Sequence, residues 1–331
     1  MESIFKIFQT LQKQSSNKSD GFNVVALPLI KHHKIGVSPN GQPMFFIKCD
    51  VSLKEKSLDN NLELISVQFN RECQLFFDKK KHTEGNYTII SLKTDSIDLQ
   101  EYFLDVVFLV IKKLSATPKL KELKVEVEKL INLFSKFTKP PKKTIQGLWA
   151  ELLVIEQSKN AEYLIRAWHA TASDKYDFND GTDKIEVKST GKSRRIHNFS
   201  IEQLNPNKNS SLIIASLFTV ESGIGKNIFG LVELIEKKIK DRNLIFHISE
   251  IMAQTLGVDF EKAFELQFDY QLAIDSLSFF ESKAIPKIEN TNIRQEISNI
   301  NFDCDLSGIK PLLKPNSNSK LHKSLFKLKS N

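Results

Sequence analysis

Apolar and polar residues alternate over residues 22–95 in short runs separated by polar turns, a pattern that predicts β-strands. The clearest predicted strands are Pro43–Cys49, Leu64–Phe69 and Tyr87–Leu92. Apolar residues then recur at helical spacing and predict helices at Gln100–Leu114 and Leu120–Phe137, the second ended by Pro140-Pro141. The opening sequence MESIFKIFQTLQKQ predicts a further, amphipathic helix.

A new pattern begins at Thr144, which can cap a helix containing Gly147–Ile155. Beyond it we predict strands near Leu164–His169, Tyr176–Phe178, Lys184–Ser189 and Leu212–Val220, helices at Asn227–Lys240 and Asn243–Leu256, and late strands at Phe264–Ser278 and Ile297–Asp305. The resulting division is a β-rich N-terminal module (1–115), a helical connector (116–141), an α/β core (142–308) and a basic C-terminal tail (309–331).

The composition is that of a soluble globular protein, because 40% of the 331 residues are hydrophobic and 26% are charged. No run of eighteen apolar residues predicts a membrane span, and the N-terminus lacks a signal-peptide core, so we expect a cytoplasmic protein. Cys49, Cys73 and Cys304 are too widely separated for a zinc site or a disulfide framework and are expected to be buried thiols.

The net charge of +7 is compatible with a polyanionic partner but does not establish one. Lysines and arginines follow one acidic segment closely, at Lys188, Lys192, Arg194 and Arg195. The tail beyond Asp305 carries no acid and six lysines: Lys310, Lys314, Lys320, Lys323, Lys327 and Lys329. Such a tail can bind phosphates or form a solvated end, and the pattern alone favours the solvated end.

Residues 176–188 predict a β-hairpin with chemical groups on one face. Side chains alternate along a strand, so Glu186 and Lys188 share a face. Asn179–Asp183 has turn composition. A turn centred on residues 180–181 places Asp177 diagonal to Glu186, and one centred on 181–182 places it directly opposite. In either register Asp177 shares their face.

The other face of this hairpin is predicted to be apolar and to carry Tyr176, Phe178, Ile185 and Val187. Asp174 is a rival for the first carboxylate, but a regular strand would place it on the apolar face. Two carboxylates with the backbone carbonyl of Val187 between them make an oxygen site suited to Mg²⁺, for which Mn²⁺ can substitute. Lys188 can orient a water or offset negative charge. Alternatively, Glu186 and Lys188 are merely a solvated strand face.

The helix at residues 147–155 adds a further acid. Its apolar stripe is formed by Leu148, Leu152 and Ile155, and Glu151 lies on or beside that stripe. An acid at such a position requires a partner. A metal site or a basic neighbour can provide it.

These segments together resemble the PD-(D/E)xK nuclease superfamily, and more narrowly a bacterial family of PD-(D/E)xK-like proteins found with restriction-modification and phage-defence genes. The residues that carry the resemblance are Gly147-Leu148-Trp149-Ala150-Glu151-Leu152, Ala167-Trp168-His169, Tyr176-Asp177-Phe178, Ile185-Glu186-Val187-Lys188-Ser189-Thr190 and His197-Asn198-Phe199-Ser200-Ile201-Glu202-Gln203-Leu204. The resemblance covers mainly residues 142–220. Tyr176 stands where the superfamily name has proline.

The resemblance implies an α/β (α+β) fold of the restriction-endonuclease type, with a central mixed sheet flanked by helices. It implies that Asp177 and Glu186 bind the metal, that Lys188 is the catalytic lysine and that Glu151 supports the metal or its waters. Four residues are predicted to contact DNA phosphates or line the site: Lys192, Arg195, His197 and Gln203. Trp168 is predicted to pack in the core. His169 can lie near the carboxylates, although no spacing supports a His₂ or His–Cys site.

The function expected on this basis is Mg²⁺-dependent hydrolysis of DNA phosphodiesters, as in type II restriction endonucleases, within a restriction-modification or phage-defence system. The alternative is a catalytically silent DNA-binding or scaffold subunit of such a complex. A structural protein with a chance motif is disfavoured by the five ordered motifs. The expected partners are double-stranded DNA and either a second copy of the chain or defence-system subunits. Neither a phosphate-binding loop nor a nucleophile elbow occurs.

Overall fold

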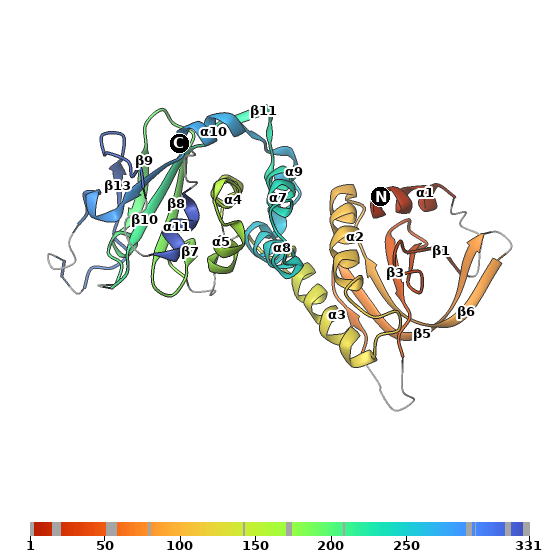
Figure 1. Ribbon diagram of the computed structural model, residues 1–331. Helices are drawn as coiled ribbons and strands as arrows, with labels where there is room; N and C mark the ends of the chain where they lie inside the picture. Colours follow the sequence, from red (N-terminus) through yellow and green to blue (C-terminus); the bar gives the residue numbers. More distant parts are fainter. Residues whose placement is uncertain are drawn as a thin grey trace. The chain divides into compact units, whose positions relative to one another are not determined.

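The computed structural model (Figure 1) describes every residue except 1–2, 15–20, 51–57, 79–80, 142, 170–173, 208, 289–292, 295, 315–318 and 327–331. The chain divides into two units, Met1–Pro140 and Pro141–Asn331. Among the described residues, no helix has the length and apolar character needed to cross a membrane.

In its described residues, the first unit contains a six-stranded sheet and three helices. The strand order is β1-β2-β3-β6-β5-β4, with bounds Phe22–Ala26, Lys34–Val37, Pro43–Ile47, Lys81–Leu92, Ile65–Asp78 and Asn60–Asn61 respectively. The helices are α1 (Ile4–Gln14), α2 (Ile97–Ile111) and α3 (Leu120–Phe134). Phe103 of α2 packs between Phe45 of β3 and Phe134 of α3, at ring-centroid distances of 5.8 Å and 5.3 Å. The strands and helices predicted for this region are confirmed.

The second unit is built on a mixed four-stranded sheet of order β12-β10-β8-β7. Strand β10 (Leu212–Phe218) is parallel to β8 (Lys184–Thr190), whereas β12 (Ser278–Glu281) and β7 (Phe178–Asn179) are antiparallel to their neighbours. A separate antiparallel pair is formed by β9 (Ile196–Ser200) and β13 (Asn301–Asp305). The fold class predicted from the sequence, a central mixed sheet flanked by helices, is confirmed.

Helix α4 (Ile145–Gln157), which contains Glu151, lies against β8 (Figure 1). It begins as predicted, because the Thr144 hydroxyl accepts a hydrogen bond from the Gly147 N–H. The described helices that contact it are α5 (Ala161–Ala167), α7 (Ile228–Glu236), α8 (Arg242–Leu256) and α11 (Lys320–Leu325). Residues 148–156 are therefore buried on all sides.

The opposite face of β8 and β10 is covered by β9 and α6 (Ile201–Leu204). Phe199 and Leu204 pack there against Leu212 and Ile214. Short elements complete this unit: β11 (Glu221–Lys226), α9 (Lys262–Glu265), α10 (Tyr270–Ser276) and the 3₁₀ turns Gly257–Asp259 and Ser282–Ala284.

Two predicted strands are wrong. Residues 164–169 belong mostly to α5, which begins because the Asn160 side chain accepts a hydrogen bond from the Tyr163 N–H. Residues 264–278 contain α9 and α10 instead of one strand, because Asp269 caps α10 at the Leu272 N–H. In both segments a polar capping side chain starts a short helix, which apolar spacing does not reveal.

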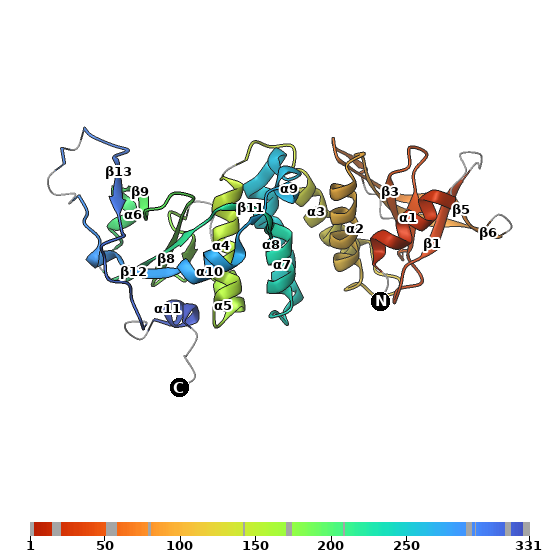
Figure 2. The ribbon, with the colours of Figure 1, turned by 90° about the horizontal axis from the view of Figure 1, so that it is seen from above.

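The prediction of a solvated C-terminal end is also wrong for residues 320–325. These residues form α11, which lies beside α5 (Figure 2) and buries Leu321, His322 and Leu325. The His322 ring nitrogen Nε2 is 3.1 Å from the carbonyl oxygen of Lys184 at the start of β8. Lys327 and Lys329 lie outside the described residues.

Candidate metal centre

Strand β8 presents Glu186 and Lys188 on its covered face. Its register pairs Glu186 with Ile214 and Lys188 with Ser216 of β10, so all four side chains point toward β9 and α6. Glu186 is only 4% exposed. The alternative of a solvated strand face is therefore wrong, and the acid is held in a place where a carboxylate needs partners.

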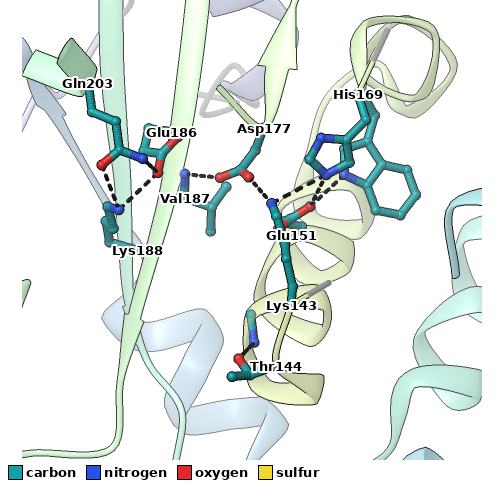
Figure 3. A network of polar contacts seen from close by, with 11 residues as sticks. Lys143, Thr144, Glu151, His169, Asp177, Glu186, Val187, Lys188 and Gln203 are labelled. Atoms are coloured by element: carbon teal, nitrogen blue, oxygen red, sulfur yellow. Dashed lines mark hydrogen bonds and ion pairs between the residues drawn. The ribbon is translucent and has the colours of Figure 1, made fainter. Parts of the chain in front are cut away.

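Gln203 and Lys188 supply partners for one oxygen of Glu186 (Figure 3). Glu186 Oε1 accepts from Gln203 Nε2 at 2.7 Å and lies 2.9 Å from Lys188 Nζ. Gln203 Oε1 in turn accepts from Lys188 at 3.2 Å, and the Ser200 capping box of α6 fixes Gln203. The Lys188 ammonium also lies 5.2 Å from the centre of the Phe199 ring. The other oxygen, Glu186 Oε2, is buried without a hydrogen-bond partner in the described part of the chain.

A tight turn brings Asp177 to the same region. Gly181 adopts φ +89°, and Asp180 Oδ1 accepts from the N–H groups of Thr182 and Asp183. Phe178 pairs with Ile185 and Asn179 with Lys184. Continued by one residue, this register places Asp177 opposite Glu186, which is the alternative with the turn centred on residues 181–182.

Asp177 itself departs from the predicted face. It precedes β7, and its carboxylate lies at the edge of β8, where Oδ2 accepts from the Val187 N–H at 2.8 Å. Figure 3 shows it between Glu186 on one side and Glu151 on the other. Tyr176 also departs from the prediction, because it packs with Phe199 and Ile214 on the Glu186 side of the sheet. The chain is not a regular strand before Phe178. The alternation of side chains between two faces therefore does not apply to Asp177 and Tyr176.

Glu151 of α4 is 3% exposed and has three partners, as its position in the helix requires. Its Oε2 accepts from Trp168 Nε1 at 2.7 Å and lies 2.9 Å from His169 Nε2. Its Oε1 lies 2.8 Å from Lys143 Nζ. Trp168 is fully buried, so its predicted packing role is confirmed.

Lys143 joins the two halves of this acidic cluster and was not predicted. Its Nζ lies 2.5 Å from Asp177 Oδ1 and 3.4 Å from His169 Nε2, in addition to its contact with Glu151. The side chain extends from the residue before the Thr144 cap and is 37% exposed. No sequence pattern marks a lysine before a capping threonine as a site residue, so its role is visible only in the folded structure.

Burial and neighbouring charge set the proton affinity of these acids. Burial raises the pKa of Glu186, the charge of Asp177 raises it further, and Lys188 offsets only part of this. Burial and the charge of Glu151 likewise raise the pKa of Asp177. Burial opposes ionisation of Glu151 too, but His169 and Lys143 outweigh it and hold the pKa below its ordinary value.

The four residues predicted to contact phosphates or line the site differ in their surroundings. Arg195 donates to the carbonyl oxygen of Ser216 at 2.9 Å and stacks on Phe218, so protein groups engage its guanidinium. His197 is buried with Nε2 2.8 Å from Ser216 Oγ, and burial lowers its pKa to about 4. Lys192 is exposed in the turn after β8. Gln203, described above, reaches the site and holds its acid and lysine.

Asp174, the rival carboxylate, accepts a hydrogen bond from Asn179 Nδ2 at 3.1 Å and is not a member of the acidic cluster found among the described residues. Among the described residues, ligand atoms of Glu151, His169 and Asp177 lie within 4.8 Å of one another, close enough for one metal ion. Glu186, beside Asp177, adds the buried unpartnered oxygen. Carboxylate oxygens and an imidazole nitrogen are donors that divalent cations accept, so the residues present fit a metal.

Comparison with known proteins yields one family. The family model described as "Putative PD-(D/E)XK family member, (DUF4420)" matches residues 4–307. No curated protein and no solved structure matches the chain.

Proposed function

Because the chain belongs to this PD-(D/E)XK-like family, we propose that it is a Mg²⁺-dependent endonuclease that hydrolyses DNA phosphodiesters, in a restriction-modification or phage-defence system. Family membership supports a nuclease. The observation that carries the catalytic proposal is the buried Glu186, with one oxygen held by Lys188 and Gln203 and the other unpartnered beside Asp177. A buried carboxylate oxygen without a partner is costly unless a cation or a proton completes it.

In this proposal Asp177, Glu186 and the backbone carbonyl of Val187, the residue after Glu186, hold the metal, and Glu151 supports the site. The metal supplies Lewis acidity at the phosphate and lowers the pKa of a water. Lys188 keeps its ammonium beside Glu186 and offsets the negative charge that develops on the phosphate. Gln203 orients both side chains. The DNA backbone is drawn by exposed cations such as Lys192.

The test is cleavage of supercoiled plasmid, methylated and unmethylated, with Mg²⁺ or EDTA. We expect nicked or linear product with Mg²⁺ alone, and a rate lower by about 100-fold or more in Asp177→Ala and Lys188→Ala. Lys262→Ala is the matched control, since Lys262 is 70% exposed and pairs only with Asp259 among the contacts described. Cleavage that persists in both site variants would overturn the assignment.

One observation favours a second function, a DNA-binding or scaffold subunit that does not cut. Lys143 already supplies Asp177 and Glu151 with a cation from the protein itself. Such a network can be held together without a metal. Specific DNA binding with no cleavage on any substrate, and no effect of Mg²⁺ on the melting temperature, would favour this function over the first.

A further inference from the structure

His169 places a nitrogen donor in the acidic cluster. Its Nε2 lies 2.9 Å from Glu151 Oε2, and the Glu151, His169 and Asp177 donor atoms are mutually within 4.8 Å. Figure 3 shows the imidazole directed at Glu151 and at the Lys143 ammonium. The ring is thus part of the site and not a neighbour that merely covers it.

The Lys143 ammonium marks the point on which these donors converge. It contacts Asp177 Oδ1, Glu151 Oε1 and His169 Nε2, one atom from each member of the cluster. A metal bound to the same three atoms would compete with the ammonium for this position. The lysine is 37% exposed and can leave toward solvent, whereas Glu151 and Asp177 are buried and stay.

The backbone fixes the ring in this place at some cost. His169 adopts φ +44°, in the left-handed region that residues with a Cβ seldom occupy. Its N–H donates to the carbonyl oxygen of Asp177 at 3.0 Å, and the preceding Trp168 pairs with Phe178. The strained residue is therefore tied to the same segment that carries Asp177. Strain of this kind is retained where the surrounding structure holds a functional group in position.

We propose that His169 is a metal ligand, and that with Glu151 and Asp177 it forms a mixed nitrogen–oxygen site that binds a first-row transition-metal ion such as Mn²⁺ more tightly than Mg²⁺. This rests on the metal dependence proposed above and goes beyond the carboxylates that the sequence predicts. Mg²⁺ strongly favours oxygen donors and octahedral geometry, whereas imidazole binds transition metals well. The ring is then neutral, with Nε2 free to ligate and the proton on Nδ1.

The experiment is electron spin-echo envelope modulation of the untagged full-length protein with one equivalent of Mn²⁺. Wild type should show modulation from a directly coordinated imidazole ¹⁴N, and His169→Ala should lose it. Isothermal titration should give a Mn²⁺ Kd about 10–100-fold weaker in His169→Ala, with a much smaller change for Mg²⁺. His247→Ala is the control, because this histidine lies on α8 beside Glu250 and outside the cluster.

The outcomes separate this proposal from the nuclease proposal. Mn²⁺ bound without ¹⁴N modulation in wild type would overturn the role of His169 and leave the carboxylate site standing. Modulation that disappears in His169→Ala supports the role even if no DNA is cut. Should His169→Ala fail to fold, a wild-type spectrum without ¹⁴N modulation still overturns the role, and one with modulation supports it because His169 is the histidine in the acidic cluster of the described residues.

Discussion

Two lysines contact the acids of this site, and they project from different kinds of structural element. Lys188 projects from the middle of β8, is 18% exposed and is held by Glu186, Gln203 and the Phe199 ring. Lys143 precedes the cap of α4, is 37% exposed and contacts Glu151 and Asp177. A lysine fixed by a sheet and a covering helix keeps its charge at one place. A lysine on the segment before a helix can be exchanged for another cation.

The two lysines should therefore differ in their effect on chemistry, which is the largest expected difference. Lys188→Met removes a charge that the proposed reaction uses, so we expect the plasmid cleavage rate to fall by about 100–1,000-fold. Lys143→Met removes a competitor of the metal, so we expect faster cleavage at limiting Mg²⁺. Equal losses in the two variants, with Lys262→Met unchanged, would show that both lysines serve the reaction.

Metal affinity, in contrast, should change more in Lys143→Met than in Lys188→Met. In Lys143→Met the acids lose their protein cation, and we expect Mn²⁺ to bind about tenfold more tightly by isothermal titration, equivalent to about 1.4 kcal/mol. Lys188→Met should change the Kd less, because Gln203 still holds Glu186. Weaker binding in Lys143→Met would mean that this lysine supports the metal instead of competing with it.

The buried Glu186 should make the metal-free protein sensitive to pH. Burial, then the charge of Asp177, raise its pKa to about 8, above the ordinary value of 4.5. A carboxyl group whose pKa is higher in the folded than in the unfolded chain binds extra protons on folding, so stability falls as pH rises through this window.

Glu186→Gln, which removes this charge, should therefore stabilise the protein in EDTA. The expected gain is about 1–3 kcal/mol in the free energy of unfolding at pH 8, and it should shrink toward pH 5. Urea unfolding at the two pH values measures it, with the exposed Glu233→Gln as control. A gain independent of pH would argue against ionisation of Glu186 as its cause.

The smallest expected effect concerns Lys192, which lies outside both lysine networks. If it contacts one phosphate, Lys192→Ala should reduce the slope of log K against log salt by about one, with little change in cleavage at saturating DNA. Fluorescence anisotropy with a labelled duplex at several salt concentrations measures this slope. An unchanged slope would remove Lys192 from the proposed interface.

The site residues that lie in a regular strand or helix could be predicted from the sequence. Alternation along a strand placed Glu186 and Lys188 on one face, and helical spacing showed that Glu151 is buried and needs a partner. The alternation of faces failed at Asp177 and Tyr176, because the chain bends at residues 175–177, before β7. The sequence pattern did not predict the role of Lys143, which lies before a helix. Nor did it predict the backbone conformation of His169, whose φ of +44° is accompanied by a hydrogen bond from its N–H to the Asp177 carbonyl.

The fold follows the same division. Long periodic segments such as β8, β10 and α8 were predicted, whereas α5, α10 and α11 were not. Each of these three short helices begins with a side-chain cap, from Asn160, Asp269 or Ser319. These segments are too short for the spacing of their apolar residues to distinguish a helix from a strand. Their conformation is determined by packing against the larger elements.

The proposed role of Asp177 is to hold a metal beside Glu186 and Lys188 for phosphodiester hydrolysis. Its most direct measurement is the plasmid cleavage rate as a function of Mg²⁺ concentration, for wild type and for Asp177→Asn, which keeps the shape of the side chain. We predict a saturable rise in wild type that EDTA abolishes, and no rise in the variant. Cleavage by the variant at the wild-type rate, with the same Mg²⁺ dependence, would contradict the claim.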